Sequence, residues 1–150
     1  MRLLIPEINK RRHSLAARFE TLPLPDFLAE LTPPEPDLAT VNPDALRNLI
    51  DAVAQLDWRS PFGICLRRAL LRYHFLRRAG LELSIVFGVR FRQIHEPTGI
   101  AGHAWNTLDG QPYCEREEDY LGFTVMYEWP EPEGRGGEPE GSRRPDEPLR

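Results

Sequence analysis

Apolar and polar side chains alternate along residues 83–91, which read LSIVFGVRF. Because successive side chains of a strand point to opposite faces of a sheet, this alternation predicts a half-buried β-strand. Only Val86 breaks the pattern. The apolar face of the predicted strand consists of Leu83, Ile85, Phe87, Val89 and Phe91.

Three further segments are expected to form strands beside this one. Residues 101–107 and 111–115 flank Asp109-Gly110, a dipeptide that favours a tight turn, so together they predict a β-hairpin. The apolar run at 123–129 predicts another strand, which Pro130 ends. The expected sheet is antiparallel and has about four strands.

Helical patterns precede the strands. Residues 13–20 and 25–31 predict two short helices, and a proline-rich break follows them. Asn42 is a favourable cap and Pro43 suits the first helical position, so a third helix is expected to begin there. Its apolar residues fall near one face, and it should end near Trp58.

A fourth helix is predicted from the dipeptide Ser60-Pro61. Ser60 can cap it, Pro61 can take its first position, and Gly80 ends it. One apolar stripe of this helix faces the expected sheet. The arginines of this helix are expected to point away from the sheet and to form a solvated face or a docking surface for an acidic partner. They are Arg67, Arg68, Arg72 and Arg78.

These elements predict an α+β fold in which the helices of the first half and the fourth helix pack on the antiparallel sheet. We divide the chain into an N-terminal helical appendage at 1–41, which is a candidate lid, a core domain at 42–129 and a disordered tail at 130–150. The tail consists mainly of Pro, Glu, Gly and Arg. It has too few large apolar residues to offset the entropy of ordering.

Composition restricts the class of protein. The 150 residues carry a formal net charge of −4, which indicates neither a nucleic-acid-binding protein nor a strongly acidic one. Two cysteines, Cys65 and Cys114, are too few for a disulfide framework. The sequence has no recognisable cleavable leader or membrane-spanning segment, so we expect a cytoplasmic protein with reduced thiols and no membrane contact.

Cys65 is expected in the first turns of the fourth helix, at the edge of its apolar stripe. The unpaired N–H groups and the positive dipole end at a helix N-terminus favour a thiolate over a thiol. The Cys65 side chain is then activated and faces the sheet. Because a lone cysteine is more often a small buried apolar residue, a catalytic role needs a second group.

His103, in the predicted hairpin, supplies that second group. If residues 108–110 form a three-residue loop, Trp105 faces Tyr113 across the hairpin. In the same register His103 faces Glu115, which would orient the imidazole and stabilise its cation. In the competing two-residue Asp-Gly turn, Glu115 faces the other side of the sheet and this pair does not form.

Two other acidic residues are candidates for the orienting role. Asp109 is six strand residues from His103, roughly 20 Å away, so we assign it to the turn. Asp119 can approach His103 only if the chain after the predicted strand bends, so it is a weaker candidate than Glu115.

Together, Cys65 as nucleophile, His103 as base and Glu115 as orienting carboxylate follow the logic of a thiol acyl-transfer triad. The backbone N–H of Cys65 is the expected oxyanion donor, and no second donor is identified. No cofactor is expected.

A metal site is not expected either, because the cysteines and the histidines lack zinc-ligand spacing. Cys114 is predicted to be a small packed residue. His74 and His95 are predicted to be solvated. The arginines of the fourth helix lack the interleaved aromatic residues that are typical of nucleic-acid binding.

Three motifs resemble one known family, the lasso-peptide leader peptidases, which are transglutaminase-like cysteine proteases. Residues 63–70 (GICLRRAL), continuing to 75–80 (FLRRAG), resemble the cysteine helix of that family. Residues 87–90 (FGVR) resemble its Gly-Val strand. Residues 102–105 (GHAW), followed by Asp109-Gly110, resemble its histidine hairpin.

This resemblance implies that the core is a cysteine peptidase that removes the leader from a ribosomally made precursor peptide. A separate ATP-dependent lasso cyclase would then close a macrolactam on the new amino terminus. A small leader-recognition protein presents the precursor in such systems, and residues 1–41 have no room for it, so a separate chain is expected. The family often carries Asp at the third catalytic position, where this chain has Glu115.

Two other functions fit the same motifs. A non-catalytic transglutaminase-like scaffold would bind the precursor or biosynthetic partners without cutting, and Glu115 at the third position favours it. An amide-forming transglutaminase would pass the Cys65 thioester to an amine instead of water. The sequence does not separate these two acyl acceptors.

Overall fold

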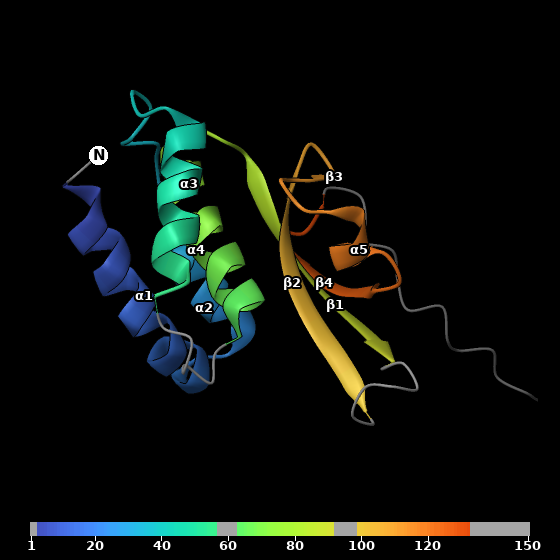
Figure 1. The fold of residues 1–150 in the computed structure, drawn as a ribbon. Helices are drawn as coiled ribbons and strands as arrows, with labels where there is room; N and C mark the ends of the chain where they lie inside the picture. The colour runs from blue at the N-terminus through green and yellow to red at the C-terminus, as the bar shows by residue number, and fades with distance from the viewer. Residues whose placement is uncertain (1–2, 57–62, 92–98, 133–150) are drawn as a thin grey trace, which may run out of the picture.

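A computed structural model describes residues 3–56, 63–91 and 99–132 of the chain (Figure 1). Four helices come first: α1 (Leu4–Thr21), α2 (Leu24–Leu31), α3 (Pro43–Ala54) and α4 (Ile64–Arg78). They are followed by β1 (Leu83–Phe91), β2 (Ile100–Leu108), β3 (Gln111–Pro112), α5 (Glu117–Tyr120) and β4 (Thr124–Trp129).

The strands form one antiparallel sheet in the order β3-β2-β1-β4. β1 and β2 pair along their whole length, from Leu83 opposite Leu108 to Phe91 opposite Ile100. Helices α1 to α4 lie on one side of this sheet, and the short helix α5 lies on the other (Figure 1). The predicted α+β fold, with helices from the first half covering one face, is confirmed.

A single hydrophobic core fills the space between the helices and the sheet. It includes Ile8 of α1, Leu28 of α2, Phe75 of α4 and Ile85 of β1. Burying a large apolar side chain of this kind stabilises the fold by about 1.5–3 kcal/mol. Both α1 and α2 contribute buried side chains to this core. The predicted boundary at residue 41 stays a prediction.

The predicted start of α3 and end of α4 are confirmed. The Asn42 side chain caps α3 by accepting a hydrogen bond of 2.9 Å from the Ala45 N–H. At the end of α4, Gly80 takes the left-handed φ of 94° that glycine tolerates best. The Leu81 N–H then bonds back to the Leu76 carbonyl at 3.0 Å, which completes the cap.

Other predicted helix boundaries differ from the structure. α1 begins at Leu4 instead of residue 13, because Leu4 and Ile8 extend its buried face by two turns towards the N-terminus. α3 ends at Ala54, a turn before the expected end at Trp58.

Several predicted features lie outside the described residues. They are the cap at Ser60, the first helical position at Pro61 and most of the tail predicted at 130–150, whose residues 133–150 are not described. α4 itself has Gly63 as its N-cap. Among the described residues, no helix combines the length and the apolar character needed to cross a membrane.

The turn between β2 and β3 is shorter than predicted. Leu108 pairs with Gln111, which leaves a two-residue turn at Asp109 and Gly110. These two residues have φ values of 51° and 74°. Positive φ at both central positions is the signature of a type I′ turn, which matches the twist of a hairpin. The predicted three-residue loop is therefore wrong, and β3 has two residues where 111–115 was expected.

Candidate active site

Cys65 is the second residue of α4, in the first turn as predicted. Its side chain is half-buried and forms no disulfide. The first turn closes with the Arg67 N–H bonded to the Gly63 carbonyl at 3.1 Å. The Cys65 N–H therefore has no acceptor within the helix, as is usual for the first residues of a helix.

A pocket of about 350 Å³ lies between the start of α4 and the strands β1 and β2. Cys65 and His103 both line it. The rest of its described lining consists of three glycines and four apolar side chains, which are Leu66, Phe87, Val89 and Ala104. Pockets for small ligands in proteins commonly have volumes of about 300–1,000 Å³. This pocket therefore has room for a peptide side chain.

His103 sits opposite Gly88 in the pairing of β1 with β2. Strand alternation places it on the α5 side of the sheet, since its neighbour Ala104 belongs to the core on the helix side. Its ring stacks on Trp105 with 5.6 Å between ring centroids, and the Phe123 centroid is 5.4 Å away. Trp105 and Phe123 thus pack against the imidazole on the α5 side of the sheet.

The Nε2 atom of His103 is buried and has no hydrogen-bond partner among the described residues. An unpaired buried polar atom costs about 1–3 kcal/mol, and a catalytic role is one reason for a protein to keep one. Within the described part of the chain, no hydrogen bond joins His103 to Cys65. Catalytic hydrogen bonds often form only when the substrate is bound.

Burial lowers the pKa of His103 below its ordinary value of 6.5, and the charge of Arg68 lowers it further. The Asp119 carboxylate opposes this shift. The imidazole is therefore neutral at pH 7, which is the form that accepts a proton. Cys65 and His103 both line the pocket, and thiol acyl transfer at this site would require the imidazole, which packs on the α5 side of the sheet, to reach the sulfur.

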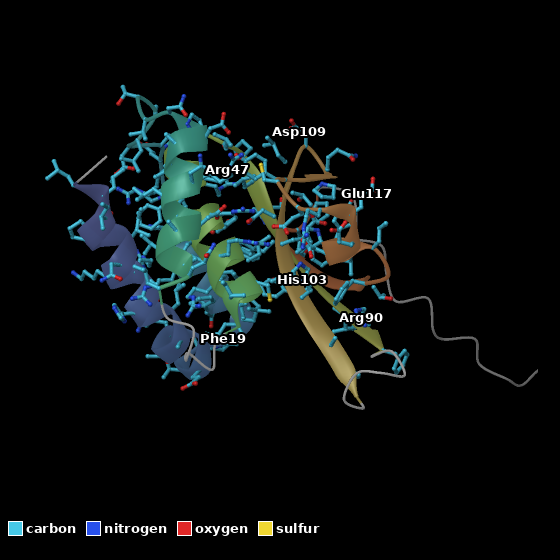
Figure 2. The ribbon with its side chains drawn as sticks, in the orientation of Figure 1. Phe19, Arg47, Arg90, His103, Asp109 and Glu117 are labelled. Atoms are coloured by element: carbon cyan, nitrogen blue, oxygen red, sulfur yellow. The ribbon has the colours of Figure 1, made fainter. Side chains whose placement is uncertain are left out.

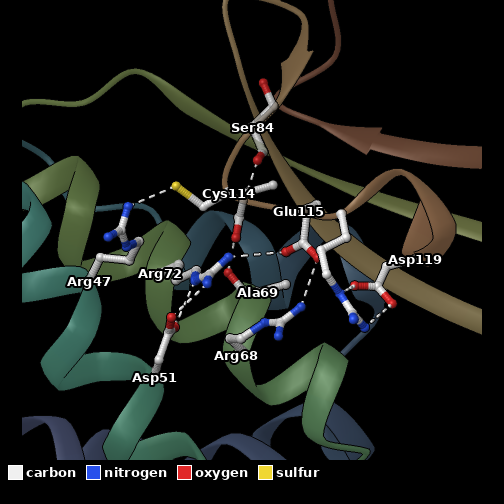
Figure 3. Close-up of polar contacts among 11 residues, drawn as sticks. Arg47, Asp51, Arg68, Ala69, Arg72, Ser84, Cys114, Glu115 and Asp119 are labelled. Carbon is white, nitrogen blue, oxygen red and sulfur yellow. Dashed lines mark hydrogen bonds and ion pairs between the residues drawn. The ribbon is translucent and has the colours of Figure 1, made fainter.

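The predicted contact between His103 and Glu115 is wrong. One Glu115 oxygen accepts a hydrogen bond of 2.8 Å from Arg68, and the other accepts one of 3.0 Å from Arg72 (Figure 3). The Glu115 side chain is 1% exposed. The two-residue turn explains the error, because it shifts the pairing by one residue and sends Glu115 to the helix side of the sheet.

Glu115 belongs to a larger buried network. Arg72 also donates two hydrogen bonds to Asp51 of α3, at 2.8 and 2.7 Å. Burial raises the pKa of Glu115, while the charges of Arg68 and Arg72 oppose the rise. The network ties α3, α4 and the segment after β3 together (Figure 3).

Asp119, the weaker candidate from the sequence, is the acidic residue that interacts with His103. Hydrogen bonds of 3.1 and 3.2 Å from Arg116 are the main cause of its lowered pKa, and the charge of His103 contributes to the lowering. Asp119 lies in α5, so the chain has bent as this candidate required. Asp109 is at the tip of the hairpin, as expected (Figure 2).

Other predicted side chains differ from expectation. Cys114 is exposed instead of packed, and its sulfur accepts a hydrogen bond of 2.9 Å from Arg47. His74 is 7% exposed instead of solvated, and its Nδ1 donates to the Leu31 carbonyl at 2.7 Å. Burial lowers the pKa of His74 to about 4. His95 lies outside the described residues.

The predicted solvated arginine face is also wrong, because Arg67 and Arg72 are 2% and 3% exposed. The described residues contain no group of three His, Cys, Asp or Glu side chains that could hold a metal ion.

Sequence reasoning missed the side chains that surround the imidazole. Trp105 follows His103 by two positions, and this spacing on a strand indicates a shared face. Phe123 and Arg68 come from distant segments, so no local pattern connects them to His103. Only the tertiary fold brings them together.

The sequence profile of the transglutaminase-like superfamily matches residues 11–128. The match runs from α1 into β4 and includes Cys65 and His103. A comparison with curated proteins gives no match. A comparison with solved structures gives none either. Because the profile covers most of the chain, the protein belongs to the transglutaminase-like superfamily.

Proposed function

We propose that this protein is a cysteine peptidase that removes the leader from a ribosomally made lasso-peptide precursor. The observation that carries the proposal is the shared pocket. Cys65, in the first turn of α4, and His103, on β2, line one apolar pocket that can receive a peptide. Membership of the transglutaminase-like superfamily supports thiol acyl-transfer chemistry at this site.

In the proposed reaction, His103 takes the proton of the Cys65 thiol as the sulfur attacks the carbonyl carbon of the scissile amide. The C–N bond then breaks, and the imidazolium returns the proton to the departing amine. Water hydrolyses the thioester, releases the leader as a carboxylic acid and restores the thiol. The Cys65 N–H, which has no acceptor within the helix, is suited to stabilise the oxyanion.

We assign the orienting carboxylate to Asp119 instead of Glu115. Arg68 and Arg72 of α4 hold Glu115 on the helix side of the sheet, and Glu115 is not among the charges that shift the pKa of His103. The charge of Asp119 raises the pKa of His103, as a carboxylate that stabilises an imidazolium does. Asp at this position also agrees with the residue type that is common in the resembled family.

The resemblance to leader peptidases supports the choice of substrate. Residues 63–70 form the start of α4, and residues 102–105 lie on β2, so two of the motifs meet at the pocket. The proposal implies three partners. They are the precursor peptide, a separate leader-recognition protein and an ATP-dependent cyclase that acts on the product.

The test incubates the purified protein with a candidate precursor and its recognition protein, without ATP, and follows leader release by mass spectrometry. We expect release by the wild type and by Cys114→Ala, which removes the other thiol. Cys65→Ala and His103→Ala should release no leader. Release that survives Cys65→Ala would overturn the proposal.

The same assay separates the two alternative functions. Binding of the precursor without any cleavage would support a scaffold. Incorporation of an added primary amine at the carbonyl end of the leader, in preference to hydrolysis, would support an amide-forming transglutaminase.

A further inference from the structure

The lining of the pocket beside Cys65 is almost entirely apolar. Leu66 follows the thiol on α4, and Phe87, Val89 and Ala104 project from the helix-facing side of β1 and β2. These four side chains come from three different elements, so the apolar character belongs to the whole pocket and not to one strand.

No charged side chain lies in the described lining of this pocket to pair with an ionic substrate group. Arg68 of α4, whose charge acts on His103, is already bound to Glu115 at 2.8 Å. Arg90 on β1 lies over the Phe123 ring at 5.2 Å, on the other face of the sheet. A charged substrate side chain would therefore lose its hydration without gaining a partner, which is strongly unfavourable.

The size of the pocket suits one large side chain. An apolar cavity of about 150 Å³ can hold a benzene ring, and this pocket has a volume of about 350 Å³. It therefore accommodates an aromatic or branched aliphatic side chain together with part of the peptide backbone.

We infer that this pocket is a specificity subsite that accepts an apolar side chain from the acyl side of the scissile bond. The inference rests on the proposed function, because the attacked carbonyl must lie at Cys65. In an extended peptide, neighbouring side chains point in opposite directions. One of the two residues before the scissile bond therefore enters the pocket, and that residue is apolar.

The inference can be tested without knowing the precursor. Dipeptidyl chloromethyl ketones alkylate an active-site thiol through the carbonyl that mimics the scissile one. Two series of probes are compared. In the first series the residue that bears the ketone is Leu, Phe, Asp or Lys and the residue before it is Gly. In the second series the residue that bears the ketone is Gly and the residue before it varies in the same way. Labelling of Cys65 is followed by intact mass in a Cys114→Ala background, and each rate is divided by the rate with free glutathione.

We expect Leu and Phe probes to label Cys65 at least about tenfold faster than Asp and Lys probes at one of the two positions, since apolar pockets commonly discriminate to this degree. Equal normalised rates at both positions, or faster labelling by a charged probe, would overturn the inference. Failure of precursor cleavage would overturn the proposed function instead and would leave this result standing.

A variant pair tests whether the pocket itself makes the choice. Val89→Asp places a carboxylate in the lining and should raise the Lys-to-Leu rate ratio at least about tenfold. Val125→Asp places the same charge on β4, outside this pocket, at a residue that is 44% exposed. It should leave the ratio unchanged. Equal effects of the two variants would count against the subsite, and circular dichroism checks that both proteins are folded.

Discussion

The buried Glu115 carboxylate forms an ion pair of 2.8 Å with the part-buried Arg68, one helical turn beyond Cys65 on α4. The pair connects the helix that carries the thiol to the segment that leads into α5 and Asp119 (Figure 3). Arg72 extends the connection to Asp51 on α3. Glu115 therefore connects the segments that carry Cys65 and Asp119, and the imidazole of His103 is not among its hydrogen-bond partners.

Replacing Glu115 should destabilise the fold strongly. Glu115→Ala leaves the buried guanidinium of Arg72 with one partner fewer, and removing one member of a buried ion pair commonly costs about 3–5 kcal/mol. We expect a loss of about 3 kcal/mol in the free energy of unfolding, measured by urea denaturation at pH 7.

The matched control is Glu118→Ala. Glu118 pairs with Arg116 at the surface, where both side chains are exposed, so its loss should cost no more than about 1 kcal/mol. Equal losses for the two variants would show that Glu115 is not a structural anchor.

Asp119→Asn should lower the pKa of His103. The Asp119 carboxylate is the charge that raises this pKa against the effects of burial and Arg68, so removing it leaves the lowering effects unopposed. The shift is measured by NMR titration of the His103 ring. Glu118→Gln, on the same helix, should leave the titration unchanged. An unchanged pKa in Asp119→Asn would remove Asp119 from the proposed site.

Stability should fall as the pH is lowered from about 6.5 to about 4, because His74 is buried in its neutral form. The pKa of His74 is about 4 in the folded protein, while an exposed histidine, as in the unfolded chain, has the ordinary value of 6.5. Between these two pH values the unfolded chain therefore binds a proton at His74 that the folded chain does not. At 1.36 kcal/mol for each pKa unit, the loss amounts to about 3 kcal/mol.

Urea denaturation at several pH values checks this prediction in the wild type and in His74→Leu, which cannot titrate. The variant should lose less stability across the window. His103 has a lowered pKa as well and contributes in the same direction to both proteins. Parallel curves for the two proteins would contradict the assignment to His74.

Gly88→Ala should destabilise the sheet at the site. A Cβ at Gly88 would lie 2.8 Å from two ring atoms of Trp105, and overpacking of this kind commonly costs about 1–3 kcal/mol. Gly102 is the matched control, because a Cβ there meets nothing within 4 Å. Thermal unfolding should separate the two variants, and equal melting temperatures would argue against the close approach of Trp105 to β1.

The strands and helix ends were predictable where the signal is local. Apolar and polar residues alternate at 83–91 because one face of the strand is buried, and β1 of the structure covers the same residues. Asn42 and Gly80 act through their own backbone neighbours, so their roles are readable from the sequence. The same holds for Cys65, whose place in the first turn follows from the helix pattern.

The contacts of the site were less predictable because they depend on long-range geometry. One residue more or less in a turn exchanges the two faces of a strand, and the shorter turn at Asp109-Gly110 moved Glu115 away from His103. The helical pattern also predicted that Arg72 faces solvent. That pattern contains no information about the partners of Arg72, Asp51 and Glu115, because they belong to other parts of the chain.

The central claim, that His103 activates the Cys65 thiol, is tested most directly by the rate at which iodoacetamide alkylates Cys65 at pH 7. The measurement uses Cys114→Ala proteins with and without the His103→Gln substitution, and intact mass reports the single remaining thiol. We expect alkylation to be at least about tenfold slower without the imidazole, because a positioned base commonly contributes a larger factor than this. Equal rates in two folded proteins would contradict the account.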